Sequence, residues 1–416
     1  MFVLSKSGKV TEKIEKCAIF ESAMANYNEE MYGLGSKRSV IRELFEFGRR
    51  KREREGEDAV FDFSLGNPSV PPPGGVPLAL STCTARPSIH GYTSAQGDAE
   101  VRRLVAESLV RRFGAPVGPD DLYMTCGAAA SLCICLKALR CPQDEFIVFA
   151  PFFPEYRVFI EAAGGKVVTV PFTEPDFQID FEAFAQALSP HTKAVIINSP
   201  NNPSGVIYTE ETLRRLTALL EESSSRFGHP VYLISDEPYR ELYYTPAPPP
   251  FVMNFYRNTL LCYSWSKSLS LPGERIGYIA VHPQAEDARG LYAAICGAGR
   301  ALGYVCAPSL FQRVAALNAD TAPEIEAYRR NRDLLYGALT KIGYECAPPD
   351  GAFYLFVKSL ESSAQAFSDK AKEYGLLIVP GDDFAAPGYV RLAYCVDYDM
   401  IRRAIPFFER LYADYR

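Results

Sequence analysis

Residues 264–277, with the sequence SWSKSLSLPGERIG, connect two short apolar runs, 260–263 and 276–281, which we interpret as buried strands. A lysine between two such strands lies near the edge of a sheet, where loss of water makes its amine a nucleophile for carbonyl groups. Neighbouring serines and Arg275 could hold a phosphate. The stretch could therefore tether a phosphate-bearing aldehyde through Lys267, although a surface-loop lysine is the simpler interpretation of this residue by itself.

The composition indicates a large globular protein with an acidic balance. The chain has 416 residues, of which 48% are hydrophobic, so it can form two domains with ample cores. A formal net charge of −6 argues against a nucleic-acid partner. No apolar segment is long enough to cross a bilayer, and the apolar start at residues 1–4 is too short for a signal peptide. We therefore expect a cytoplasmic protein without a membrane partner.

The cysteines and histidines indicate neither disulfides nor a metal site. The eleven cysteines are scattered, and several lie in apolar runs, so free thiols are the better prediction. Cys133 and Cys135 have no second pair at zinc spacing, and the four histidines are far apart, so we expect no metal ion.

Strands and helices alternate through the middle of the chain. Strands are predicted at 122–125, 145–149, 166–170, 194–198, 231–235, 260–263 and 276–281. Helices are predicted at 128–139, 155–163, 180–188 and 209–227, after an earlier one that Asp98 caps and Gly114 ends. This alternation favours an α/β fold: a mostly parallel sheet covered by helices on both faces.

The two ends of the chain depart from this pattern. Residues 1–30 show no clear pattern and are interpreted as an arm, and the proline- and glycine-rich segment 71–77 marks a crossing between domains. A helix at 39–51 and a strand at 60–65 precede that crossing. After about residue 310, helices at 308–318, 323–342 and 363–374 and strands at 353–357, 376–379 and 389–394 predict a smaller α+β domain. The predicted division is therefore 1–73 (arm and first part of the small domain), 74–310 (large domain) and 311–416 (rest of the small domain).

Polar and small residues gather where predicted strands end, which is where parallel sheets bind ligands. The segments are Thr125–Ala130, Pro151–Tyr156, Asn198–Gly205 and Ser235–Tyr239. A helix N-terminus offers amides to an anion, aromatics can stack on a flat ring, and a buried Asp236 needs a cationic partner. Arg391, in the predicted strand 389–394, could bind a carboxylate. Taken alone, each has a simpler explanation: a tight turn, core packing, a helix cap or a solvent-facing position.

Together the segments fit one ligand, a flat cationic ring with a phosphate that is linked to a lysine: pyridoxal 5′-phosphate (PLP). From about residue 65 to 394, the chain resembles the class I/II aminotransferases of the fold-type I PLP-dependent enzymes, close to the bacterial aspartate aminotransferase branch. The motifs that carry the resemblance are Asn202-Pro203-Ser204-Gly205, Asp236-Glu237-Pro238-Tyr239, Ser264-x-Ser266-Lys267 with Pro272-Gly273-x-Arg275-x-Gly277, Gly351-Ala352-Phe353-Tyr354, and Val379-Pro380-Gly381 with Val390-Arg391-Leu392.

The resemblance implies a role for each matching residue around the ring. Lys267 would form a Schiff base with the cofactor and move the substrate α-proton. Asp236 would pair with the ring nitrogen, and Asn202 and Tyr239 would bond to the ring hydroxyl. Phe153 falls where an aromatic residue, more usually tryptophan or tyrosine, stacks on the ring.

The resemblance also implies a phosphate site and a carboxylate site. The phosphate would be held by residues near the lysine and at a helix start: Ser264, Ser266, Arg275, Gly127, Ala128 and Ala129. Tyr92 would reach the phosphate of a neighbouring subunit, so a homodimer with shared sites is expected. Arg391, Asn202 and the backbone at Gly66 would bind the substrate carboxylate. Two departures from the family are Ala128, in a loop that often carries polar side chains, and Asn67, where acidic residues are frequent.

The implied activity is transfer of an amino group from an L-amino acid to a 2-oxo acid, with aspartate and 2-oxoglutarate as the candidate pair. A PLP-dependent carbon–sulfur β-lyase is the alternative, because such enzymes share the lysine, aspartate and arginine. A PLP-binding regulator without activity is a further alternative. A dicarboxylate substrate would need a second cation, for which Arg300 from the partner subunit is the candidate.

Overall fold

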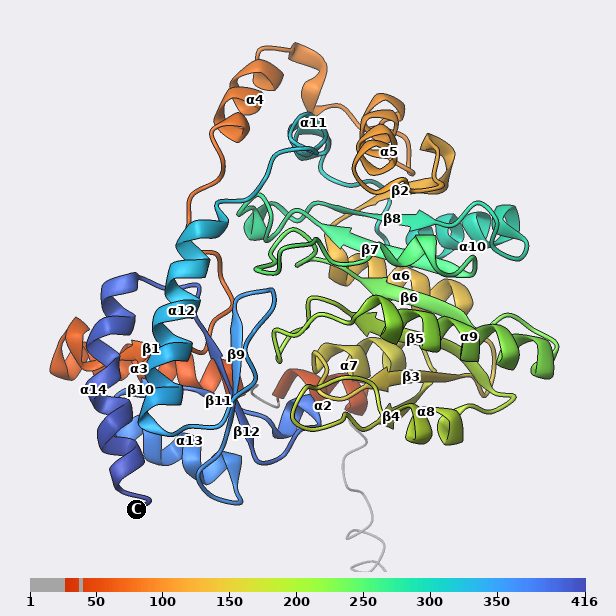
Figure 1. The fold of residues 1–416 in the computed structure, drawn as a ribbon. Coiled ribbons are helices and arrows are strands. Elements are labelled where there is room, and N and C mark those ends of the chain that lie inside the picture. Colours follow the sequence, from red (N-terminus) through yellow and green to blue (C-terminus); the bar gives the residue numbers. More distant parts are fainter. Residues whose placement is uncertain (1–26, 37–39) are drawn as a thin grey trace, which may run out of the picture.

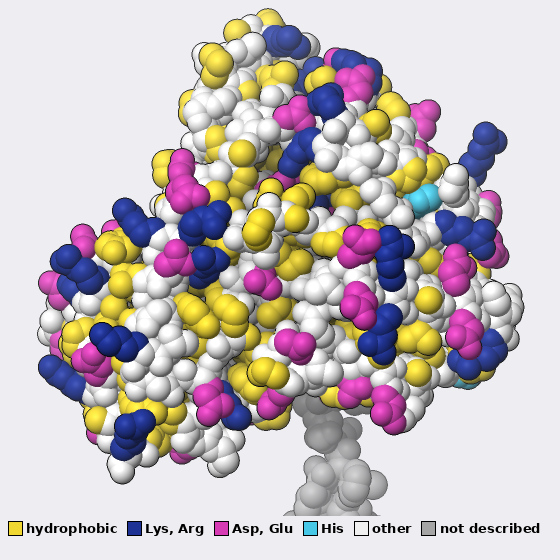
Figure 2. All heavy atoms as spheres, in the orientation of Figure 1, with side chains coloured by type: hydrophobic (Ala, Val, Ile, Leu, Met, Phe, Trp, Pro, Cys, Tyr) yellow, Lys and Arg dark blue, Asp and Glu magenta, His cyan; other side chains and the backbone are white. Residues whose placement is uncertain are grey.

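The computed structural model describes residues 27–36 and 40–416, which form a large and a small unit (Figure 1). We define the large unit by a seven-stranded sheet with its helices, and the small unit by a three-stranded sheet with its helices. Most of the predicted arm at residues 1–30 lies outside the described residues. On the face shown in Figure 2, basic and acidic side chains are interspersed. Among the described helices, none combines the length and the apolar character that crossing a membrane requires.

The seven-stranded sheet has the order β2-β8-β7-β6-β5-β3-β4. The strands are β2 (Leu122–Thr125), β3 (Glu145–Phe149), β4 (Lys166–Val170), β5 (Thr192–Asn198), β6 (Tyr232–Asp236), β7 (Thr259–Ser264) and β8 (Gly277–Val281). All neighbouring pairs are parallel except those of β8, which runs antiparallel to both β2 and β7. The predicted mostly parallel α/β sheet is confirmed.

Helices cover both faces of this sheet, because its strands are apolar on both sides. One face packs against α6 (Ala128–Leu139), α7 (Glu155–Ala162) and α10 (Ala288–Ala301). The other face is covered by α5 (Ala99–Phe113), α8 (Phe181–Ala187), α9 (Glu210–Phe227) and α11 (Ser309–Leu317), and α4 (Gly75–Thr84) packs against α11. Successive strand residues alternate between the faces, so Cys262 packs with the first group of helices and Tyr263 with the second.

The small unit combines the two ends of the described chain. Its antiparallel sheet has the order β11 (Val379–Pro380), β12 (Tyr389–Ala393) and β9 (Tyr354–Lys358), and β1 (Phe61–Asp62) pairs in parallel with β10 (Leu376–Leu377). The helices on the left of Figure 1 are α3 (Val40–Glu55), α12 (Ile325–Ile342), α13 (Ala364–Glu373) and α14 (Tyr398–Ala413). The short α2 (Glu29–Ser36) has no buried residue. The predicted domain boundaries at residues 73 and 310 stay a prediction.

Four of the described helices were not predicted from the sequence: α2, α4, α10 and α14. Proline disguises two of them: Pro77 is third in α4, and Pro406 lies inside α14. A proline in the first turn does not interrupt a helix, because the amide that it lacks has no partner there. The segment 71–77 is therefore partly helical, and not only a connector. The cysteines that the structure describes are free thiols.

The predicted cap of α5 is confirmed and makes a test of local stability. Asp98 accepts hydrogen bonds from the amides of Glu100 and Val101, at 2.9 and 3.2 Å, and forms an ion pair with Arg313. We expect Asp98→Ala to lower the free energy of unfolding in urea by about 1–2 kcal/mol, because two amides lose their acceptor. Asp98→Asn keeps the cap and should lose less. An equal loss in both variants would show that the ion pair, and not the cap, stabilises this helix start.

Candidate active site

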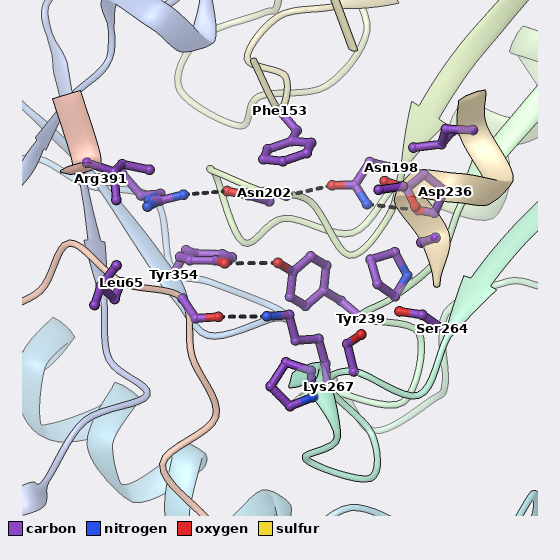
Figure 3. Close-up of a pocket in the computed structure, with 18 of the residues that line it drawn as sticks. Leu65, Phe153, Asn198, Asn202, Asp236, Tyr239, Ser264, Lys267, Tyr354 and Arg391 are labelled. Atoms are coloured by element: carbon purple, nitrogen blue, oxygen red, sulfur yellow. Dashed lines mark hydrogen bonds between the residues drawn. The ribbon is translucent and has the colours of Figure 1, made fainter. Parts of the chain in front are cut away.

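A cavity of about 330 Å³ lies between the two units and contains most of the predicted site residues (Figure 3). The predicted residues that line it are Gly66, Ala128, Ala129, Phe153, Asn202, Asp236, Tyr239, Ser264, Ser266, Lys267, Arg275 and Arg391. Gly127 lies one residue before the lining residues of α6. The volume is that of a site for a small molecule.

Lys267 lies in the turn between β7 and β8, and its amine points into the cavity. The Nζ atom donates a 2.6 Å hydrogen bond to the carbonyl oxygen of Gly66 and lies 5.5 Å from the ring centre of Phe353. Burial lowers the pKa of Lys267 to about 8, and the charges of Arg391 and Arg275 act in the same direction. A neutral, nucleophilic amine is therefore accessible near neutral pH.

Asp236 ends β6 at the opposite wall of the cavity and is only 5% exposed. The hydroxyl of Tyr156 donates to its Oδ2 at 2.6 Å, but its Oδ1 has no hydrogen-bond partner among the described residues. Burial raises the pKa of Asp236 to about 7, the bond from Tyr156 lowers it, and nearby Glu237 raises it. A buried carboxylate oxygen without a partner is costly, so this wall is suited to a cationic or hydrogen-bond-donating ligand atom.

Arg391 and Asn202 form the side of the cavity that faces the small unit. Arg391 is 3% exposed, because β12 is covered on both sides, so the alternative of a solvent-facing position is wrong. It donates to Asn202 Oδ1 at 3.0 Å and to the carbonyl of Ser64 at 2.7 Å. Its Nε has no partner within the part of the chain that the structure describes. The guanidinium therefore keeps a donor available for an anionic group.

Asn198 orients Asp236 and Asn202, and two tyrosines bond to each other in the wall of the cavity. Asn198 donates to the backbone carbonyl of Asp236 at 2.8 Å and accepts from the amide of Asn202 at 2.7 Å, which ties β5 to β6. The hydroxyls of Tyr239 and Tyr354 share a 2.9 Å hydrogen bond, and burial raises the pKa of Tyr239 well above its usual value. Figure 3 shows this chain of bonds along the cavity.

The sequence did not predict several of the residues that hydrogen-bond to the site residues. Tyr156 was grouped with the ring-stacking aromatics, and no signal identified Ser64 or Tyr354 as partners, because these contacts join distant segments. Asn198, the last residue of a predicted strand, carried a usable signal: its place beside Asp236 follows once the two strands are neighbours.

The start of α6 and the loop of Arg275 form an end of the cavity whose groups are suited to an anion. Gly127 caps α6 with a φ of 90°, so the first amides of the helix are free for a ligand. A side chain at Gly127 would come within 3.0 Å of the Arg275 guanidinium, and one at Gly277 would meet the Tyr263 carbonyl at 2.3 Å. The two glycines therefore allow the strand, the helix and the arginine to converge on one point. Ser264 lines the cavity beside them.

Tyr92 and Arg300 do not line this cavity in the single chain. The side chain of Tyr92 is 98% exposed, and Arg300 is exposed near the end of α10. Their predicted roles across a subunit interface stay predictions.

Comparisons with known proteins identify the family. The sequence matches the family "Aminotransferase class I and II" over residues 58–408. The chain belongs to this family.

Individual relatives agree with the family match. A solved structure of an amino transferase from Eubacterium rectale is 54% identical, covers 94% of this chain and 99% of its own, and superposes with a TM-score of 0.92. The aspartate/prephenate aminotransferase of Thermus thermophilus is 32% identical over 370 residues, which is 86% of this chain and 92% of that protein. A probable N-acetyl-LL-diaminopimelate aminotransferase of Bacillus subtilis is 29% identical over 360 residues, 83% of this chain and 87% of its own. The chain is thus an aminotransferase of fold type I, near the bacterial aspartate aminotransferases.

Class I and II aminotransferases are PLP-dependent enzymes, and the residues of this cavity fit that cofactor. The partnerless Oδ1 of Asp236 matches a protonated ring nitrogen, and the helix start with Arg275 matches a phosphate. Lys267 is an amine with a lowered pKa in the same cavity. The charges that line the cavity therefore suit a ligand with a cationic ring and an anionic group.

The raised pKa of Asp236 predicts a pH-dependent stability of the cofactor-free aminotransferase. Its carboxyl loses its proton near pH 4 in the unfolded chain but near pH 7 in the folded one, so the folded state loses stability as pH rises through this window. Asp236→Asn removes the titration and can still accept the bond from Tyr156. We expect the stability of the variant relative to wild type to increase by about 2 kcal/mol between pH 5.5 and pH 8, measured by urea unfolding. An equal difference at both pH values would contradict the assignment.

Proposed function

We propose that this aminotransferase binds PLP in the cavity between its two units, through Lys267, and moves an amino group between an L-amino acid and a 2-oxo acid. The observation that carries the proposal is the convergence of three groups in one cavity: a lysine with a lowered pKa, a buried carboxylate with a partnerless oxygen, and a buried arginine with a spare donor. Perturbed titratable groups that face one another in a cleft are typical of active sites.

Lys267 is proposed to carry the proton that moves in the reaction. When bound, PLP supplies an electron sink for negative charge at the substrate α-carbon. Lys267 Nζ, with its pKa near 8, takes the α-proton as a base and returns a proton as an acid. Its present acceptor, the Gly66 carbonyl, lies 2.6 Å away and holds the amine over the cavity.

The other polar groups are proposed to bind and orient. Asp236 holds the cationic ring nitrogen with Oδ1, while Tyr156 keeps Oδ2 in place. Tyr239 and Asn202 bond to the ring hydroxyl. Arg391 binds the substrate α-carboxylate with its spare donor, near the backbone of Gly66, and its bond to Asn202 links the substrate end to the cofactor end.

The remaining predicted residues are proposed to stack on the ring of the cofactor and to bind its phosphate. Phe153 lies over the cavity in Figure 3 and stacks on the ring. The phosphate is held by the first turn of α6 and by the lysine loop, through the amides of Ala128 and Ala129 after Gly127 and the side chains of Ser264, Ser266 and Arg275. Tyr92 completes this end from a second copy of the chain, which makes the proposed enzyme a homodimer.

Aspartate with 2-oxoglutarate is the first substrate pair to test. The relative from Thermus thermophilus bears the name aspartate/prephenate aminotransferase, while that from Bacillus subtilis names a different amino donor. Among the described residues that line the cavity, the cations are Lys267, Arg275 and Arg391, and each already has a proposed role. A distal carboxylate therefore needs another cation, and Arg300 of a second copy is the proposed source.

A half-reaction with Lys267→Ala tests the central assignment. The PLP-loaded wild type is mixed with single amino acids, and the change in cofactor absorbance is followed by stopped flow. We expect the variant to react at least about a thousandfold more slowly, because it lacks both the nucleophile and the base. Lys166→Ala, which removes a surface lysine paired with Glu145, is the matched control and should react like wild type.

Two results would contradict the proposal in different ways. Normal turnover by Lys267→Ala would show that another group carries the chemistry. Release of ammonia and pyruvate from the wild type, without a 2-oxo acid acceptor, would replace transamination with β-elimination.

A second variant tests the proposed source of the additional cation. We expect Arg300→Ala to lower the rate with aspartate relative to alanine by about tenfold or more, because a charge-assisted hydrogen bond to the distal carboxylate is lost. Steady-state kinetics with both amino acids measure this ratio. Arg289→Ala, which changes an exposed arginine at the other end of α10, should leave it unchanged. An unchanged ratio in Arg300→Ala would remove Arg300 from the site.

A further inference from the structure

A buried network of charged and hydroxyl groups lies behind the cavity. Its centre is Arg240, which is 3% exposed and follows β6 by four residues. Arg240 donates to Glu237 Oε2 at 2.9 Å and to the hydroxyl of Tyr278 at 3.0 Å, and its guanidinium lies 4.4 Å from the ring centre of Tyr263. The described part of the chain thus keeps a charged cluster where the sheet would otherwise pack apolar side chains.

One tyrosine hydroxyl connects this network to the lysine turn. The hydroxyl of Tyr263 donates to Glu241 Oε1 at 3.4 Å and lies 2.8 Å from the hydroxyl of Ser268, the residue after Lys267. Either hydroxyl can donate in the shorter bond, and the contact with Glu241 is longer than an ordinary O–H···O hydrogen bond. Glu241 in turn forms an ion pair with Arg112 of α5. The lysine turn is therefore linked through Tyr263 to a helix on the far face of the sheet.

No side chain of the network lines the cavity, but three of its members are sequence neighbours of residues that do. Side chains alternate along a strand, so Tyr263 faces the α5 side of the sheet while Ser264 faces the cavity. Members of the network adjoin three cavity residues in the same way: Glu237 adjoins Asp236, Tyr263 adjoins Ser264, and Ser268 adjoins Lys267. A displacement on one face is thereby transmitted to the other.

A purely structural role does not account for this composition. Desolvating several charges is costly, and well-packed apolar residues usually give equal or greater stability in their place. The Arg240, Glu237 and Glu241 side chains are all buried, and Arg240 Nε has no hydrogen-bond partner among the described residues but lies 3.6 Å from Glu241 Oε1. Directional bonds, unlike apolar contacts, define one position for the groups that they join.

We propose that Tyr263, supported by Glu241 and Arg240, is a positioning residue that holds the turn of Lys267 and sets where its amine lies in the cavity. The inference rests on the proposed role of Lys267. It concerns residues that contact neither cofactor nor substrate, and it predicts an effect on the reaction step rather than on substrate binding.

Tyr263→Phe tests the proposal, because it deletes one hydroxyl and leaves the ring beside Arg240. Tyr344→Phe is the matched control: Tyr344 is 4% exposed and donates to the carbonyl of Phe408 at 2.9 Å, in the small unit. The PLP-loaded proteins are compared in three measurements: the thermal midpoint, the pH midpoint of the absorbance of lysine-bound cofactor, and the rate and half-saturation constants of the half-reaction.

We expect both variants to lose some thermal stability, since each loses a buried hydrogen bond. Only Tyr263→Phe should shift the pH midpoint of the cofactor absorbance. It should also lower the first-order rate constant about tenfold and change the half-saturation constant little, because a misplaced reacting group slows chemistry more than binding. Ser268→Ala should reproduce these effects. The double variant should be no worse than either single variant, since both break one connection.

The outcomes separate this inference from the proposed function. If wild type never acquires the absorbance of lysine-bound PLP, the proposed function fails and the inference fails with it. If wild type does so, and Tyr263→Phe matches it in pH midpoint and rate constant while losing only thermal stability, the network is structural and the inference alone is overturned. Additive losses in the double variant would likewise contradict a connection through Ser268.

Discussion

A buried carboxylate with one partnerless oxygen is the constraint on which the rest of the site depends. Asp236 is held at the end of β6 by Tyr156 on one oxygen and, through its backbone, by Asn198. The desolvation that raises its pKa would be costly in a protein whose only task was to fold. The cost becomes useful when a cation completes the pair. Asp236 Oδ1 therefore needs a cationic partner. The lysine and arginines of the cavity do not supply one, because they bind other groups.

The topology of the sheet explains why these groups meet. β5, β6 and β7 are parallel neighbours in exact sequence order, so Asn198, Asp236 and Ser264 emerge at one edge. The reversed strand β8 begins at the same edge, where Gly277 lies opposite Ser264 and against Gly127. Apolar runs and strand-ending polar residues were sufficient to predict a mostly parallel sheet with these residues at its edge, but not the strand order or the reversal of β8.

Contacts between the two units could not be predicted in this way. The bond from Arg391 to Asn202 spans 189 positions, and the bond between Tyr239 and Tyr354 spans 115. Both depend on how the small unit packs on the large one, which no local pattern encodes. The burial of Arg391 shows the same limit: alternation along a single strand does not reveal that both of its faces are covered. Helix α4 was missed for a local reason: Pro77 was interpreted as part of a connector, although a proline in the first turn does not interrupt a helix.

The two faces of the large sheet have different chemistry, and the strands between them are stiff. A strand rises about 3.3 Å per residue, so a shift of β7 by one position would exchange the faces of Tyr263 and Ser264. The position of β7 in the sheet therefore fixes both the network on one face and the cavity residues on the other. Apolar packing alone tolerates small displacements, whereas the 2.8 Å bond between Tyr263 and Ser268 depends closely on distance and angle. A site that depends on a lysine placed within a few tenths of an ångström therefore constrains residues that never touch its ligand. Charges buried behind a catalytic sheet are then explained by the precision of the site rather than by the stability of the fold.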